Sequence, residues 1–292
     1  MRIDDKLIFL TGDLGFQAFE NIQAEFPERF INVGVAEQNM INISAGLASE
    51  GLKPVCYSIA PFLVFRPFEQ IRINLALHNQ KVMLVGNGGG FGYGIMGATH
   101  HALEDIAVLS TLQNFTCVVP HSNEHLDCAA DYCFSENCGP SYLRMGFGTS
   151  EKMTIETTFE KVSHLTFGND ITVVGIGPVM LNMLEKIDNY SIDLFAVNQM
   201  PLTEISLELI NSLKKTKKLL VLEEHVLQGG LGQSLVYEFH KLNLPFLFRH
   251  LYVQGYPNND YGNQDFHQKQ NSLDTNSILN TIESLINDTA KQ

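Results

Sequence analysis

The chain alternates short apolar runs with segments of helical periodicity over almost its whole length, and this pattern constrains its fold more than any other feature. In the first half, the runs predicted to be strands lie at residues 7–10, 30–35, 82–85, 115–119 and 141–145. Apolar residues follow helical spacing over 40–47 and 68–75, and Ser122 or Asn123 can cap a helix that ends near residue 134. Such alternation is typical of a parallel sheet covered by helices.

A second set of strands follows a polar segment. Residues 146–161 are rich in threonine and glutamate, have no clear apolar period, and are predicted to be a linker. Later strands are predicted at 171–174, 192–197, 219–222 and 246–253, with a long loop at 254–271 and an amphipathic helix around 278–285. We therefore predict an α/β protein with two domains, a parallel-sheet domain at residues 1–155 and a smaller α/β domain at residues 162–292.

The composition excludes several classes of function. The formal net charge of -13 and the pI near 5.1 argue against a nucleic-acid partner, which would require clustered lysine and arginine. The charged start and the short apolar run ending at Thr11-Gly12 predict neither a signal peptide nor a membrane span, so we expect a cytoplasmic protein without a membrane partner. The five cysteines lack CxxC spacing and are expected to be reduced thiols that bind no metal.

Three segments have residues suited to chemistry. The first, 33–40, places Glu37 where a strand ends and a helix begins, which is where open parallel sheets present functional groups. The alternative is a first-turn carboxylate stabilised by the helix dipole. The second contains Phe62, Phe65 and Phe68, which can form either a core or a wall for a heteroaromatic ring.

The third segment is rich in glycine. Seven glycines lie within residues 86–97, just before His100 and His101. No Gly-Lys-Ser/Thr follows, so this is not a Walker loop. A histidine beside such a loop can donate a proton or bind a hydroxyl near neutral pH, and the alternative is a purely structural histidine.

Taken in order, these segments resemble the C-terminal half of transketolase. The resemblance rests on residues 11–14, 34–40, 62–68, 94–100 and 143–144, and residues 223–225 with 229–232 resemble the family's C-terminal domain. It implies a thiamine-diphosphate pyrimidine-binding domain followed by a transketolase C-terminal domain. Glu37 would be the activating carboxylate, hydrogen-bonded to the pyrimidine N1′ nitrogen. The cofactor-binding residues implied in this way are Glu37, Asp13, Leu14, Phe62, Phe65 and Phe68, the last as a supporting wall.

The resemblance also implies substrate contacts. His100 would be catalytic and would touch the substrate near its reacting hydroxyls, with His101 behind it, while Arg144 would lie near a substrate phosphate. Met96 stands where the family has an aspartate that binds a donor-substrate hydroxyl, which argues against the usual sugar phosphate. The expected activity is transfer of a two-carbon ketol unit between sugars that are phosphorylated or otherwise modified.

The family's Gly-Asp-Gly motif, which binds the diphosphate and a divalent metal, is absent from the sequence. We therefore expect a separate N-terminal transketolase subunit to bind the diphosphate with Mg²⁺ or Ca²⁺, in an α2β2 assembly. Two other interpretations share the fold. One is the β subunit of a 2-oxoacid dehydrogenase, which the run from Thr99 to Asp105 disfavours, and the other is a non-catalytic scaffold subunit, which the presence of Glu37, Phe62, Phe65 and His100 disfavours.

Overall fold

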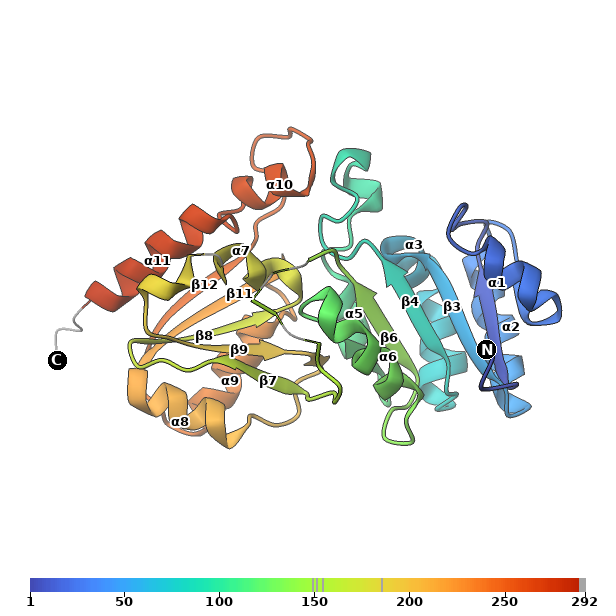
Figure 1. The fold of residues 1–292 in the computed structure, drawn as a ribbon, viewed down its shortest axis with the longest axis horizontal. Helices are drawn as coiled ribbons and strands as arrows, with labels where there is room; N and C mark the ends of the chain where they lie inside the picture. The colour runs from blue at the N-terminus through green and yellow to red at the C-terminus, as the bar shows by residue number, and fades with distance from the viewer. Residues whose placement is uncertain (149, 151, 154, 185, 289–292) are drawn as a thin grey trace.

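The computed structural model describes residues 1–288 except 149, 151, 154 and 185, and it consists of two α/β units side by side (Figure 1). The N-terminal sheet has the strand order β10-β5-β6-β4-β3-β1-β2. Its strands are parallel except for β10, which comes from the second half of the chain and pairs antiparallel with β5. The strands are β1 (Leu7–Thr11), β2 (Phe30–Asn32), β3 (Lys53–Ile59), β4 (Met83–Asn87), β5 (Thr116–Val118), β6 (Ser141–Met145) and β10 (Gln199–Met200).

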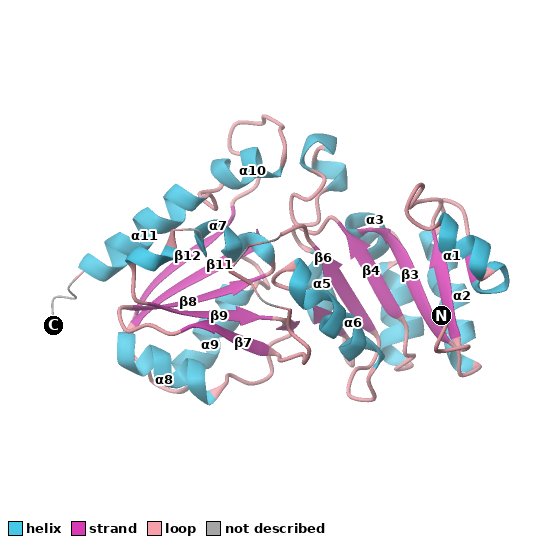
Figure 2. Cartoon of the chain, in the orientation of Figure 1, coloured by secondary structure: helices cyan, strands magenta, loops and turns pink. Residues whose placement is uncertain are grey.

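Helices cover both faces of this sheet (Figure 2). They are α1 (Glu20–Glu25), α2 (Glu37–Ser49), α3 (Ala60–Phe65), α4 (Phe68–Gln70), α5 (Asp105–Ser110) and α6 (Leu126–Phe134), with a π-helical segment at Ile71–Leu77. Short 3₁₀ turns lie at Pro27–Arg29, Gly94–Met96, Ala98–His100 and Asn123–His125. The helices predicted at 40–47 and 68–75 are therefore present, but the side chain of Ser122 forms no capping hydrogen bond.

The C-terminal sheet has the strand order β12-β11-β8-β9-β7, parallel except for β7. Its strands are β7 (Val162–Thr166), β8 (Ile171–Ile176), β9 (Ile192–Val197), β11 (Lys218–Val226) and β12 (Leu247–Val253). Its helices are α7 (Leu181–Leu184), α8 (Leu207–Thr216), α9 (Leu231–Lys241), α10 (Gln264–Gln270) and α11 (Thr275–Asn287), with 3₁₀ turns at Pro178–Met180 and Ile187–Asn189. The predicted two-domain α/β fold is confirmed.

Alternation along the central strand β11 explains why this domain needs helices on both faces. Leu219 and Val221 pack in the core that includes α8 and α9, whereas Leu220 and Leu222 pack in the core that includes α7 and α11. Burial on both faces gives the continuous apolar run expected of a parallel strand.

The elements that the sequence analysis missed include strands β3, β7 and β10 and helix α10. Strand β3 was not predicted because it contains Pro54, a residue typical of turns and edge strands. Strand β7 was not predicted because its sequence is polar. The loop predicted at 254–271 contains α10, which begins where the Asn263 side chain accepts a hydrogen bond from the Phe266 amide at 2.9 Å. The buried side chains of α10 include His267 and Gln268. Because these buried residues are polar, the sequence shows no apolar period that would indicate a helix.

The described part of the predicted linker contains no helix or strand. All five cysteines are buried free thiols, and within the described residues no group of three histidine, cysteine or acidic side chains is arranged to hold a metal. No described helix is long and apolar enough to cross a bilayer.

Candidate active site

The carboxyl ends of β1, β2, β3 and β4 bring the predicted site residues to one edge of the sheet. Glu37 is the first residue of α2, and only 3% of its side chain is exposed. Its two carboxylate oxygens accept hydrogen bonds from Nη1 of Arg66 at 2.9 and 3.0 Å. The guanidinium carbon of Arg66 lies 3.9 Å from the ring centroid of Phe62. A planar cation thus stacks on an aromatic ring and donates to a buried carboxylate.

Arg66 is a residue of this site that the sequence analysis did not select. Aromatic rings are predicted around Glu37, but the structure also places this cation there, ion-paired with the carboxylate. The signal was available, since Phe62 and Arg66 are four residues apart where α3 ends and therefore project to the same side.

An open depression of about 760 Å³ surrounds Glu37, and Val35, Gln38, Asn42 and Arg66 contribute to its wall. It offers room for a flat ring beside the carboxylate, provided that Arg66 moves. Because Arg66 is about half exposed, its displacement requires no rearrangement of the core.

The other predicted cofactor residues make no hydrogen bond to Glu37 within the described part of the chain. Phe65 is 38% exposed, whereas Phe68 is half-buried and packs against the hydrophobic core. Asp13 is exposed, and its carboxylate accepts a hydrogen bond from the Asn32 amide at 3.2 Å, so it lies between the ends of β1 and β2. The carbonyl of the half-buried Leu14 accepts from the Thr11 hydroxyl at 3.1 Å. Their cofactor contacts stay predictions.

His100 lies beside the aromatic part of the site. Its ring is 5.0 Å from that of Phe62, edge on, and its Nδ1 is 3.0 Å from the Thr99 hydroxyl. Met96 is 54% exposed in the 3₁₀ turn before it. The structure therefore brings together Glu37, Phe62 and His100, with Arg66 between Glu37 and Phe62 and the His100 ring against Phe62.

His101 points into a different environment. It is buried, its Nδ1 lies 2.7 Å from the Tyr256 hydroxyl, and its Nε2 lies 3.0 Å from the Gly94 carbonyl. Desolvation lowers the pKa of this histidine. It ties the glycine-rich segment to the C-terminal domain, which agrees with its predicted place behind His100.

Arg144 does not fit its predicted role. Only 4% of the residue is exposed. Its Nε donates to Asp105 at 2.8 Å, and its Nη2 donates to the carbonyls of Ala102 at 2.8 Å and Glu224 at 3.2 Å. A guanidinium that pairs with a buried carboxylate is not free to bind an anion in this arrangement, so the contact with a substrate phosphate stays a prediction that this geometry does not support. Arg144 instead joins the two domains behind the site.

The segment Glu223–His225 at the end of β11 positions the glycine-rich loop. Glu223 accepts hydrogen bonds from the first amides of α9, those of Leu231 at 2.8 Å and Gly232 at 3.0 Å. Glu224 accepts from the Phe91 amide at 2.5 Å, and His225 accepts from the Ala107 amide at 3.2 Å, so both reach into the first domain. Desolvation raises the pKa of Glu224 and lowers that of His225.

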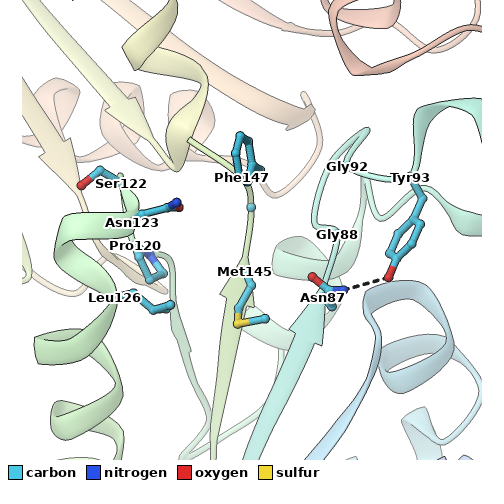
Figure 3. Close-up of a pocket in the computed structure, with 11 residues that line it drawn as sticks. Asn87, Gly88, Gly92, Tyr93, Pro120, Ser122, Asn123, Leu126, Met145 and Phe147 are labelled. Atoms are coloured by element: carbon cyan, nitrogen blue, oxygen red, sulfur yellow. Dashed lines mark hydrogen bonds between the residues drawn. The ribbon is translucent and has the colours of Figure 1, made fainter. Parts of the chain in front are cut away.

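A pocket of about 450 Å³ lies in the first domain at the carboxyl ends of β4 and β6 (Figure 3). Asn87 and Tyr93 form one side, joined by a 2.8 Å hydrogen bond from the Asn87 amide to the Tyr93 hydroxyl. The Tyr93 ring lies 6.3 Å from that of His100. Successive side-chain contacts therefore connect Glu37, through Arg66, Phe62 and His100, with Tyr93 in the wall of this pocket.

Comparison with known families agrees with this arrangement. Residues 1–146 match the transketolase pyrimidine-binding domain, and residues 160–261 match the transketolase C-terminal domain. The chain is 29% identical over 271 residues to one subunit of the apulose-4-phosphate transketolase of Actinobacillus succinogenes, covering 89% of this chain and 86% of that protein. It is 34% identical over 245 residues to the putative transketolase C-terminal section of Methanocaldococcus jannaschii, covering 79% and 75%.

Other matches extend the comparison. The chain is 26% identical over 298 residues to the 1-deoxy-D-xylulose-5-phosphate synthase of Clostridium perfringens, but it spans only 47% of that protein. Among solved structures, a split-gene transketolase described as an inactive β4 tetramer superposes with a TM-score of 0.81 at 26% identity, covering 98% of this chain and 93% of that one.

Proposed function

Because the chain belongs to the transketolase family, we propose that it is one subunit of a split, thiamine-diphosphate-dependent transketolase that transfers a two-carbon ketol unit between sugars. The observation that supports this most strongly is the buried Glu37 carboxylate facing a planar group stacked on Phe62. The guanidinium of Arg66 makes both contacts that an aminopyrimidine would need, a stacking contact with Phe62 and a hydrogen bond to Glu37. The residues present therefore fit that ring.

Each residue of the chain would have a distinct task. Glu37 would hold a proton at the pyrimidine N1′ nitrogen, and Phe62 and Phe65 would flank the ring, with Phe68 behind them. Asp13 and Leu14 would lie near the middle of the cofactor. When bound, thiamine diphosphate supplies an electron sink beside the ketose carbonyl. His100 would bind the substrate hydroxyls and exchange a proton with them.

A second polypeptide would complete the site. The sequence contains no Gly-Asp-Gly motif, so an N-terminal transketolase subunit would bind the diphosphate together with Mg²⁺ or Ca²⁺, in an α2β2 assembly. Relatives named as one subunit of a transketolase, or as its C-terminal section, support a division between two chains. The similarity to a split-gene transketolase described as an inactive β4 tetramer supports a requirement for that second chain.

Substitution of Glu37 tests the proposal. In the assembled enzyme, Glu37→Ala and Glu37→Gln should lower kcat by about a hundredfold or more, because the proton relay to the ring is lost. Glu69→Gln is the matched control, since Glu69 is an exposed carboxylate on the nearby helix α4. Size-exclusion chromatography should show that each variant still assembles.

Unchanged turnover in Glu37→Ala would exclude this mechanism. It would favour the scaffold interpretation, in which the fold is retained and the carboxylate only stabilises the start of α2.

A further inference from the structure

The pocket beyond His100 has walls of unusual chemistry for a site that handles sugars. Pro120, Leu126, Met145 and Phe147 give it apolar surfaces. Asn87 and Asn123 face the space between them from opposite sides (Figure 3). The Asn87 side-chain nitrogen donates a hydrogen bond to the Tyr93 hydroxyl. The side-chain carbonyl oxygen of Asn87 can therefore accept a hydrogen bond from a ligand. The polar side chains that line this pocket, Asn87, Tyr93, Ser122 and Asn123, are therefore all uncharged.

No cation lines this pocket among the residues that the structure describes. The nearest arginine in sequence, Arg144, precedes the lining residue Met145, but its guanidinium is buried and paired with Asp105 at 2.8 Å. A phosphate dianion placed here would lose its hydration without gaining a paired charge, which is strongly unfavourable. An apolar group placed against Met145 and Leu126 would instead gain from burial.

We propose that this pocket receives the distal end of the sugar substrate, and that this end is uncharged and partly deoxygenated, as in a deoxy sugar without a terminal phosphate. The inference rests on the proposed transketolase function and specifies its substrate class. The ring contacts from Phe62 to His100 and from His100 to Tyr93 connect the proposed cofactor residues with the wall of this pocket. The two asparagines can bind the remaining hydroxyls, while the apolar walls accept a methyl or methylene group.

Matched substrates test this specificity in the assembled enzyme with thiamine diphosphate and magnesium. A terminally deoxygenated aldose, its parent aldose and the corresponding terminal phosphate ester are compared as acceptors with one donor ketose. The deoxy sugar should have a kcat/KM at least about tenfold higher than that of the phosphate ester, because a pocket without charged groups rejects the ester. A preference for the ester would overturn the proposal while leaving ketol transfer intact.

Introducing a cation should reverse the preference. Met145→Lys places an ammonium in the pocket, and Asn123→Lys does so from an exposed position while removing one of the two asparagines. Both should raise kcat/KM for the phosphate ester relative to the deoxy sugar by about tenfold. Ile155→Lys, at a residue of the linker that is 76% exposed, is the matched control and should change neither value. An unchanged ratio in both pocket variants would count against the proposal.

A binding measurement separates this inference from the proposed function. Methionine labelled with ¹³C at its methyl group gives a signal for Met145, assigned with a Met145→Leu variant. Titration of the complex with the deoxy sugar should shift this signal, and the phosphate ester should not. A shift without turnover would retain the pocket and reject the ketol-transfer function, whereas turnover without any shift would reject the pocket.

Discussion

Arg66 occupies the position that the proposed cofactor ring would need. Its guanidinium lies over Phe62 and pairs with Glu37, yet 44% of its side chain is exposed. An ion pair and a cation–π contact at such a half-exposed position together contribute about 1 kcal/mol. The ring must displace both contacts before it can bind. Arg66→Gln should therefore raise the affinity of the assembled enzyme for thiamine diphosphate by about fivefold.

Calorimetric titration of the cofactor measures this change. Arg72→Gln serves as the control, because Arg72 is an exposed arginine in the π-helical segment that follows. Weaker binding in Arg66→Gln would mean that Arg66 moves to hold the cofactor, and the competition described above would be wrong.

Single residues also mark the limit of what the sequence can predict. Glu37 could be selected because it lies in a short motif beside a predicted strand end, and Phe62 and His100 because each lies in a motif that resembles the family's. Arg144 could be selected in the same way, but its ion-pair partner lies 39 residues earlier and the Glu224 carbonyl 80 residues later. Long-range contacts of this kind decide whether an arginine faces a ligand or a buried carboxylate, and no local pattern records them.

At the scale of elements, the linker is more constrained than its composition suggests. Glu156 of the linker lies 3.3 Å from His121 Nε2 and 3.7 Å from His125 Nε2. The His125 ring is buried, stacks on His121 and Phe159, and makes no hydrogen bond through either nitrogen in the described structure. Desolvation is the main cause that lowers the pKa of His125 to about 4. The polar segment thus contacts two buried histidines, and its closer contact is with His121.

This arrangement predicts that acid destabilises the protein. Because the pKa of His125 is lower in the folded chain than the 6.5 of a free histidine, the unfolded chain takes up a proton first. Stability is therefore full above about pH 6.5 and is lost as the pH falls toward 4. Glu156, whose pKa is lowered chiefly by its hydrogen bond with His121, adds a loss only below its ordinary value of 4.5.

Urea unfolding at pH 7 and pH 5 measures the effect. The free energy of unfolding should fall by on the order of 1 kcal/mol in the wild type, and by clearly less in His125→Phe, which keeps the ring stacking and cannot be protonated. His78→Phe, at an exposed histidine, should behave as the wild type does. Equal losses in His125→Phe and the wild type would assign the pH dependence to other groups.

The elements that sequence reasoning missed share a physical cause. Strand β3 lies between β1 and β4 although it begins Lys53-Pro54, since the missing amide of one proline is tolerated within an otherwise paired strand. Helix α10 buries His267 and Gln268. In both cases tertiary packing overrides the local conformational preference of the sequence.

At the scale of the whole molecule, Glu224 connects the two domains through hydrogen bonds. Its buried carboxylate accepts from the Phe91 amide of the first domain, from Gln264 at 3.1 Å, and from Gln268 at 2.5 Å. In a Glu224→Gln variant, the side-chain NH2 group would face one of these hydrogen-bond donors in place of a carboxylate oxygen that accepts from it. Glu224→Gln should therefore lower the free energy of unfolding by about 2 kcal/mol, measured by urea denaturation at neutral pH.

The matched control is Glu238→Gln, because Glu238 pairs with the half-exposed Lys241 within helix α9 and should change stability by less than about 0.5 kcal/mol. Equal effects of the two substitutions would show that the domain contact through Glu224 contributes little.

The last prediction concerns assembly. In the proposed function this chain would supply a carboxylate and aromatic rings to the cofactor ring, but its sequence has no Gly-Asp-Gly motif for the diphosphate and its metal. Diphosphate binding without paired charge is unfavourable, so the chain alone should bind thiamine diphosphate with magnesium at least about a hundredfold more weakly than the mixture with its partner subunit. Calorimetric titration of both samples tests this. Equal binding by the chain alone would mean that it completes the site by itself, for example between its own copies, and would exclude a split site, whereas binding only in the mixture would locate the missing half on the partner.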